Sequence, residues 1–298
     1  MPSMTLFESD LRSLPLIQRG KVRDLYAVDD AHLLMVATDR LSAFDVILPD
    51  PIPGKGRVLT AMSCFWFGET MNIVDNHLAA MPMEAVITDA AERAQLAGRS
   101  LVVRRLRALP FECVVRGYLA GSGWAAYQRS GQLCGIRLPE GLAPAQRLAE
   151  PLFTPARKAA VGEHDENICY EQLVEHMGSA LAARLRATAI ALYAHAAAYA
   201  QTRGVIIADT KFEFGLDDQD RLILIDEALT PDSSRFWPAD RYRAGQRPVS
   251  FDKQFVRDYL DTLDWDKTAP GPRLPAAVIA RTAARYREVQ ARLLPGDG

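Results

Sequence analysis

The segment that most constrains the fold is residues 206–215, which read IIADTKFEFG. In an extended strand, alternate side chains lie on the same face. Asp209, Lys211 and Glu213 therefore share one face, and the two phenylalanines share the other. Two acids and a lysine on one face are costly to desolvate unless they bind something or stay hydrated. The pattern predicts a strand with one face in the core and the other at a polar surface or site.

A second strand is expected at residues 222–228, across the acidic turn at 217–220, and it carries Asp226 and Glu227. Opposed or diagonal neighbours on adjacent strands lie about 5–8 Å apart. If the register places Asp226 on the polar face of the first strand, its carboxylate joins that of Glu213. Carboxylates and a lysine at this range suit Mg²⁺ and a polyphosphate. A hydrated sheet face held by ion pairs is the alternative, and the pattern alone leaves both open.

The other strong polar motif is residues 111–123, FECVVRGYLAGSG. It predicts a strand that ends in a Gly-Ser-Gly turn, followed by a short helix at 124–129. Free backbone N–H groups at the start of a helix bind anions, and Ser122 could add a hydroxyl donor. Arg116 could donate two hydrogen bonds to a phosphate. A tight turn with a capping serine is the alternative.

Three shorter motifs are weaker signals. Residues 18–24 place two basic side chains beside a glycine, where a hairpin could close over phosphates, although an exposed edge strand fits equally. Residues 230–237 form a polar turn directly after the second acidic strand, and an ordinary surface turn is the alternative. Residues 163–167 contain a histidine and an aspartate that could bind a metal or exchange a proton, against a charged surface loop.

Periodicity elsewhere predicts a mixed fold. Residues 21–28 and 32–37 read as a hairpin, and 101–106 as a strand that Leu109-Pro110 breaks. Helices are expected at 58–71, at 170–202, and in the C-terminal part after residue 251. Strands grouped in hairpins, with helices between the groups, favour an α+β fold over a repeating βαβ sheet.

Charge and composition exclude several classes of protein. The chain of 298 residues has 35 Lys and Arg against 37 Asp and Glu, which argues against a general nucleic-acid binder. No apolar run reaches the ~18 residues of a membrane span, and the N-terminus does not read as a secretory signal. The 4 cysteines contain no C-x-x-C pair that would suggest zinc. These features predict a cytoplasmic protein that binds neither nucleic acid nor membrane.

Taken in order, these segments resemble the SAICAR synthetase family of purine biosynthesis, in its longer, yeast-like form. Residues 109–122 and 207–215 look like two signatures of that family. Five further blocks follow the same order, and the resemblance runs from about residue 16 to residue 267. These blocks are residues 20–24, 37–45, 150–155, 162–168 and 226–235.

The resemblance implies a two-lobed, ATP-grasp-like α+β architecture. A smaller β-rich domain, residues 1–107, would cover ATP, and an α+β domain, residues 108–298, would bind the substrates and metal and carry the C-terminal helices. The implied reaction joins 4-carboxy-5-aminoimidazole ribotide (CAIR) to L-aspartate, with cleavage of ATP to ADP and phosphate, through an acyl phosphate. The implied cofactor is Mg²⁺, and a monomer is favoured over an oligomer.

The resemblance also assigns roles by position. Lys211, Glu213 and Asp226 would be catalytic, with Glu213 and Asp226 holding the Mg²⁺. The residues implied for ATP are Gly20, Lys21, Arg23, Arg107, Leu109, Glu112 and Lys211, with the adenine against the linker near 107–109. Those implied for the 5′-phosphate of the ribotide are Arg116, Ser122 and Arg235. Those implied for the rest of the ribotide and for aspartate are Ser42, Asp45, Lys158, His164, Asp165 and Asp232.

Two alternative hypotheses assign other functions to the chain. One is an ATP-dependent carboxylate–amine ligase with a different ribotide or amino acid. The other is a regulatory nucleotide-binding protein without turnover. Because a binder without catalysis has no need of metal carboxylates, the joint presence of Lys211, Glu213 and Asp226 argues against the second.

Overall fold

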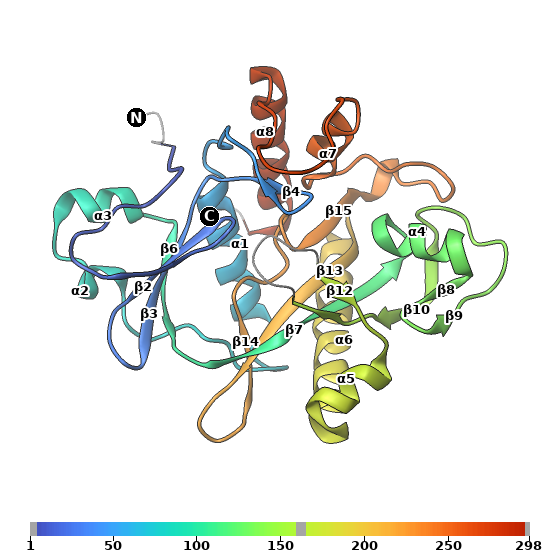
Figure 1. Cartoon of the computed structure of the whole chain (residues 1–298), viewed down its shortest axis with the longest axis horizontal. Coiled ribbons are helices and arrows are strands. Elements are labelled where there is room, and N and C mark those ends of the chain that lie inside the picture. Colours follow the sequence, from blue (N-terminus) through green and yellow to red (C-terminus); the bar gives the residue numbers. More distant parts are fainter. Residues whose placement is uncertain (1–4, 159–164, 296–298) are drawn as a thin grey trace.

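The first sheet of the fold is built from the N-terminal third of the chain. In the computed structural model, which describes residues 5–158 and 165–295, four antiparallel strands pair in the order β1-β2-β3-β6 (Figure 1). Their bounds are β1 Leu16–Arg19, β2 Arg23–Ala27, β3 His32–Ala37 and β6 Ser100–Arg104. The hairpin expected at 21–28 and 32–37 is confirmed, because β2 pairs with β3 over its whole length.

The second sheet has seven strands and carries most of the polar motifs. Its main order is β12-β11-β7-β13-β14, with β10 also paired to β7 and β15 to β13. The bounds are β7 Arg107–Tyr118, β10 Arg147–Phe153, β11 Ala156–Arg157, β12 Glu166–Asn167, β13 Val205–Leu216, β14 Leu222–Ile225 and β15 Ser234–Pro238. Two short hairpins complete the strands: β4 Ser42–Ala43 with β5 Val46–Ile47, and β8 Gln132–Leu133 with β9 Ile136–Arg137.

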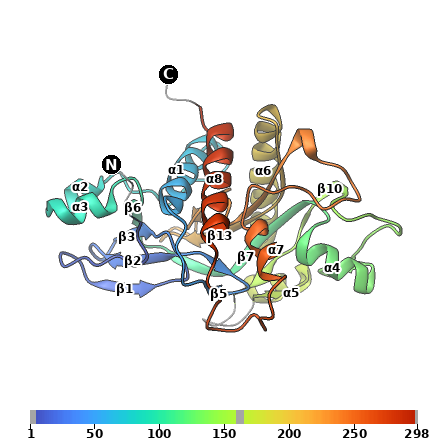
Figure 2. The same ribbon diagram turned by 90° about the horizontal axis from the view of Figure 1, so that it is seen from above.

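Three long helices lie on one side of the central strands β7 and β13, as Figure 2 shows. They are α1 (Lys55–Glu69), α6 (Ser179–Thr202) and α8 (Ala276–Leu293). The shorter helices are α2 Met83–Val86, α3 Ala90–Leu96, α4 Gly121–Ser130, α5 Tyr170–Met177 and α7 Gln254–Leu260, with a 3₁₀ turn at Ala239–Arg241.

The alternation in β13 directs its side chains as the sequence predicts. Phe212 and Phe214 are fully buried in the main core against α6, whose apolar stripe includes Leu185, Ala189 and Leu192. The opposite face of β13 is therefore the polar face. This division by alternate residues is what places the acids and the lysine of the strand at a common site.

A second, smaller core fixes the position of α7. Leu41, Leu48 and Ile52 pack with Val256 and Leu260, which project from one side of α7. Because apolar residues of α7 are held in this way, the other side of the helix, which carries polar residues, faces the cleft described below.

The long helix expected at 170–202 is in fact two helices. Gly178 has a φ of 77°, and it separates α5 from α6. A residue with a positive φ cannot continue a right-handed α-helix, and glycine adopts such a φ without a Cβ clash. The apolar stripe continues across the break, so periodicity alone did not reveal it.

The prediction that Leu109-Pro110 breaks a strand is also wrong. β6 ends at Arg104, and β7 begins at Arg107 and continues through Pro110. Its register against β13 shifts between Glu213 and Gly215, opposite this proline. An irregularity of this kind allows a strand to accommodate a residue that has no N–H to donate.

No helix in the described part of the chain combines the length and the apolar character needed to cross a bilayer.

Candidate active site

A large polar cleft, with a volume of about 940 Å³, lies on the polar face of β7 and β13. The loop before β2, the segment after β14 and the first turn of α7 complete its walls. Most of the residues that the sequence singled out meet here. These are Gly20, Lys21, Arg23, Ser42, Asp45, Glu112, Arg116, Ser122, Lys158, Asp165, Lys211, Glu213, Asp226, Asp232 and Arg235.

Two of the predicted residues that the structure describes are not among those lining the cleft. Arg107 is exposed and pairs with Asp220 over 2.6 Å, and Leu109 is buried in the main core. Both belong to strand β7, so the prediction of a linker at residues 107–109 is wrong. Their contact with adenine stays a prediction. His164 lies outside the described residues.

Asp209 connects the two arginines predicted to bind phosphate. It is opposite Arg116 of β7 on one side and opposite Arg235 of β15 on the other. Its Oδ2 atom accepts a hydrogen bond from Nη1 of Arg235 at 2.6 Å and from Nη1 of Arg116 at 3.2 Å. Arg116 also donates to the hydroxyls of Ser122 and Thr154, at 3.3 and 3.1 Å. One acid thus holds two guanidinium groups side by side, with one net positive charge remaining for an anion.

The turn at Gly121 allows this arrangement. Gly121 has a φ of 52°, and a Cβ added there would lie 2.1 Å from Nη2 of Arg235. Only glycine therefore lets the guanidinium lie against the backbone at the start of α4. The Gly-Ser-Gly motif therefore forms the turn and also leaves room for the side chain of Arg235.

Lys211 is tied to the neighbouring strand. Its Nζ donates to Oε1 of Glu112 on β7 over 2.7 Å. Burial lowers the pKa of Lys211, but the carboxylates of Glu112, Asp165 and Glu213 together outweigh burial, so that the net shift is upward. The lysine is therefore a permanent cation in the cleft.

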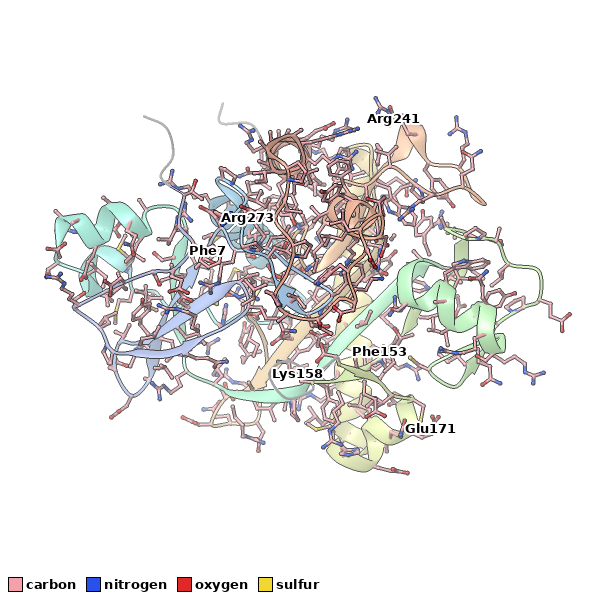
Figure 3. All side chains as sticks on the ribbon, turned by 45° about the horizontal axis from the view of Figure 1, so that its top comes forward. Phe7, Phe153, Lys158, Glu171, Arg241 and Arg273 are labelled. Atoms are coloured by element: carbon pink, nitrogen blue, oxygen red, sulfur yellow. The ribbon has the colours of Figure 1, made fainter. Side chains whose placement is uncertain are left out.

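Glu213 and Asp226 each face a cation. Lys158, near the middle of the molecule in Figure 3, donates from Nζ to Oε2 of Glu213. Arg23 of β2 pairs with Oδ2 of Asp226, and also with Glu227 at 3.2 Å. The pairs formed by Arg23 connect the first sheet to the second across the cleft.

The side chain of Asp226 points into the cleft because of a backbone conformation that the sequence did not reveal. The residue opposite Glu213 on β14 is Ile225, so a continued strand would turn Asp226 to the other face. β14 ends at Ile225 instead, and Asp226 has a φ of 66°, which brings its side chain back beside Glu213. A non-glycine residue in this conformation carries a backbone cost.

The electrostatics mark this point as one that favours a cation. Burial raises the pKa of Asp226 to about 7; Arg23 opposes the shift, and the carboxylates of Glu213 and Glu227 add to it. Among the described residues, no group of three or more histidine, cysteine or acidic side chains is arranged to hold a metal by itself.

The loop of Gly20 and Lys21 is held from beneath by Arg40. The fully buried Arg40 donates from Nη2 to the carbonyl of Gly20 at 3.0 Å and from Nε to that of Lys21 at 3.1 Å. It also pairs with the buried Asp24 at 2.6 Å. Because these contacts fix the backbone, the side chain of Lys21 extends into the cleft, where it pairs with Asp45.

Asp232 is anchored at the far wall. Its Oδ2 pairs with the buried Lys55 of α1 at 2.6 Å, and its Oδ1 accepts from the hydroxyl of Tyr286 of α8 at 2.7 Å. Lys55 holds the pKa of Asp232 below its usual range, with Lys253 adding to the effect and burial opposing it. This carboxylate is thus a fixed negative charge with both oxygens occupied.

Several cleft residues were missed at the sequence level as site residues. Asp209 was noted on the polar face but given no role, and Lys253 and Arg257 of the α7 region were not considered. The available signal was their four-residue spacing in a segment expected to be helical, which puts both on one face.

Comparisons with known proteins identify the family of the chain. The model of the SAICAR synthetase family matches residues 16–272. A phosphoribosylaminoimidazole-succinocarboxamide synthase of Thioalkalivibrio sulfidiphilus is 65% identical over 291 residues, 98% of each chain. The protein of the same name from Methylococcus capsulatus is 64% identical over 97% of each chain.

Solved structures resemble the chain over nearly its full length. The SAICAR synthase of Saccharomyces cerevisiae, complexed with SAICAR, superposes with a TM-score of 0.89 at 42% identity, over 97% of this chain and 98% of that one. A SAICAR synthetase in complex with ADP gives a TM-score of 0.68 at 25% identity, over 94% and 97%.

Proposed function

Because the chain belongs to the SAICAR synthetase family, which joins CAIR and aspartate in purine biosynthesis, we propose that its cleft performs this ligation through an acyl phosphate. The observation that carries the proposal is the meeting of two features in one cleft. A paired-arginine site for a phosphate lies on the same sheet face as the carboxylates Glu213 and Asp226.

The ribotide is anchored by its 5′-phosphate. Arg116, Arg235 and Ser122 converge there, and the cation excess left by Asp209 suits a phosphate that binds two guanidinium forks. With the phosphate held at this end of β13, the imidazole carboxylate extends toward Lys211 and Glu213, two and four residues along the same strand face. Ser42, Asp45, Lys158, Asp165 and Asp232 line the remaining walls.

The chemistry requires activation of a poor acyl donor. A carboxylate oxygen of CAIR attacks the γ-phosphorus of ATP, ADP leaves, and an acyl phosphate results. The amine of L-aspartate then attacks the acyl carbon, phosphate leaves with the electrons of the C–O bond, and the nitrogen loses a proton to give the amide. Lys211, cationic throughout, would stabilise the charge on the transferred phosphoryl group. Lys21, in the loop before β2, and Arg23 of β2 line the cleft and would lie over the ATP phosphates.

Glu213 and Asp226 fit a Mg²⁺ ion. Both side chains line the cleft, and each faces a cation. Mg²⁺ is usually held by one or two carboxylates together with substrate phosphates, which agrees with the absence of a three-ligand cluster in the described residues. When bound, the ion would neutralise phosphate charge. Arg23 and Lys158 would then be released to phosphate or carboxylate groups.

The architecture we propose is ATP-grasp-like. Residues 1–107 would cover ATP with the sheet β1-β2-β3-β6, and residues 108–298 would bind the substrates. Helix α1 packs into the main core with α6 and α8, so the two parts would share an extensive contact. Adenine would lie near residues 107–112. We further propose that the protein acts in the cytoplasm as a monomer.

Release of ADP tests the function directly. It is measured with CAIR, with L-aspartate, with both, and with neither, in the presence of Mg²⁺ and ATP. Rapid release is expected only with both substrates. A second ligase activity would show as release with another amino acid, and release no greater with both substrates than with ATP alone would reject the proposal.

A further inference from the structure

Two cationic side chains in the cleft have no carboxylate partner among the described residues. Among the described residues, each lysine or arginine lining the cleft forms an ion pair with a carboxylate, except Lys253 and Arg257. The paired ones are Arg19, Lys21, Arg23, Arg116, Lys158, Lys211 and Arg235. A cation that is partly buried without a partner pays a desolvation cost that a bound anion would offset.

The two unpaired cations face different parts of the cleft. The charged groups around Lys253 are Asp232, Arg257, Lys211 and Lys55, which places it toward the proposed acyl-transfer end. The nearest acid, Asp232, is already engaged through both oxygens, by Lys55 and Tyr286. Lys253 therefore remains available to a ligand.

Arg257 lies nearer the opposite end. The charged groups around it include Arg235, Asp252 and Asp209, which belong to or adjoin the paired-arginine site. Asp252 is occupied locally, because it accepts from the backbone N–H of Phe236 at 3.1 Å and from the hydroxyl of Ser250. The N-cap residue Lys253 and Arg257 of α7 are thus two free cations that face two different regions of the cleft.

We propose that Lys253 binds a carboxylate of the amino-acid substrate, whereas Arg257 serves the ribotide phosphate. This inference rests on the proposed function. An amino acid that attacks the acyl carbon must lie beside Lys211, and L-aspartate brings two carboxylates there that need a counter-charge. The other cations at that end have acidic partners within the protein. Lys253 thereby selects a dicarboxylic amino acid over its amide.

The test compares two substitutions that shorten neither side chain greatly. Lys253→Met is expected to raise the KM for L-aspartate at least tenfold and leave the KM for CAIR within twofold. Arg257→Met is expected to do the reverse. Lys253→Arg, which keeps a positive charge, should recover most of the affinity for aspartate. Because the lysine has no partner to leave unpaired, loss of its charge should not lower the unfolding temperature.

A matched control is Arg247→Met. Arg247 pairs with Asp258 of α7 on an exposed surface and does not line the cleft, so both KM values should be unchanged. Discrimination gives a second readout: the ratio of kcat/KM for L-aspartate to that for L-asparagine should fall in Lys253→Met.

The outcomes separate the two proposals. If the wild-type protein releases no ADP with CAIR and L-aspartate, the proposed function fails. If the wild type turns over but Lys253→Met keeps the wild-type KM for L-aspartate, or raises only the KM for CAIR, the assignment of Lys253 is wrong and the function stands.

Discussion

Arg235 and Asp209 form the shortest link in the phosphate site, with Nη1 of the arginine 2.6 Å from Oδ2 of the acid. The same oxygen accepts from Arg116, so one carboxylate compensates the buried guanidinium of Arg116 and the partly buried one of Arg235. Removal of the acid would leave two like charges together in a region of low dielectric.

We therefore expect Asp209→Ala to lower the free energy of unfolding by about 3–5 kcal/mol, because it leaves buried charges without a partner. Urea denaturation measures this loss. The control is Asp220→Ala, which removes the exposed partner of Arg107 and should cost below about 1 kcal/mol. Equal effects of the two substitutions would contradict a central role for Asp209.

Substitution of Gly121 tests the contact between the turn and Arg235. Gly121→Ala is expected to displace the guanidinium and raise the KM for CAIR at least tenfold, because the added Cβ would overlap Nη2. Gly131→Ala is the matched control. Gly131 also has a positive φ, 67°, but a Cβ there has nothing within 4 Å. Both variants should lose about 1 kcal/mol of stability from backbone strain, and only the first should weaken ribotide binding.

Asp226→Asn should abolish turnover and leave ribotide binding intact. The substitution removes a proposed metal ligand but does not touch the paired arginines. A loss of kcat of at least about 10²-fold is expected from the lost charge stabilisation. ADP release and equilibrium binding of CAIR give the two readouts, and Asp218→Asn, in the exposed acidic turn, is the control. Unaltered turnover would remove Asp226 from the metal site.

The pH dependence of dicarboxylate binding follows from Lys253. Burial lowers its pKa to about 8, and Asp232 only partly opposes this. The lysine is charged below that pH and neutral above it. Succinate carries the two carboxylates of aspartate without a titrating amine. Its inhibition constant against L-aspartate should therefore rise as the pH increases through 8.

Arg257 and Lys211 also surround Lys253, and both stay protonated over that pH range, because arginine is always charged and the carboxylate of Glu112 helps to raise the pKa of Lys211. Lys55 is paired with Asp232. The rise should disappear in Lys253→Arg, because a guanidinium does not titrate near pH 8. The same rise in wild type and variant would trace the effect to another group.

Much of the site follows from local pattern. The alternation of Lys211 and Glu213 with Phe212 and Phe214 requires one polar and one apolar face wherever the strand lies, and the structure confirms it. Arg116 and Ser122 meet because a strand and a tight turn separate them by only six residues. Short-range geometry of this kind can be predicted from one sequence.

What the sequence could not reveal depends on torsion angles and on distant segments. Asp226 enters the cleft through a positive φ that no composition rule requires of an aspartate. The helix broken at Gly178 keeps its apolar stripe, so periodicity predicted a single helix. The role proposed for Lys253 depends on which carboxylates other residues occupy, and that is a property of the assembled cleft.

The internal pairing of the cleft has a consequence for how it exchanges ligands. Lys21, Arg23, Lys158 and Lys211 already hold carboxylates, so an arriving phosphate must take each cation from an internal competitor. The affinity for a phosphate ligand then depends on the difference between the contacts that the ligand forms and the internal ion pairs that it replaces. We expect a shallower dependence on ionic strength than the number of cations suggests, and weak retention of inorganic phosphate or sulfate. The protein stays largely self-neutralised until a ligand of the right shape replaces several internal partners at once.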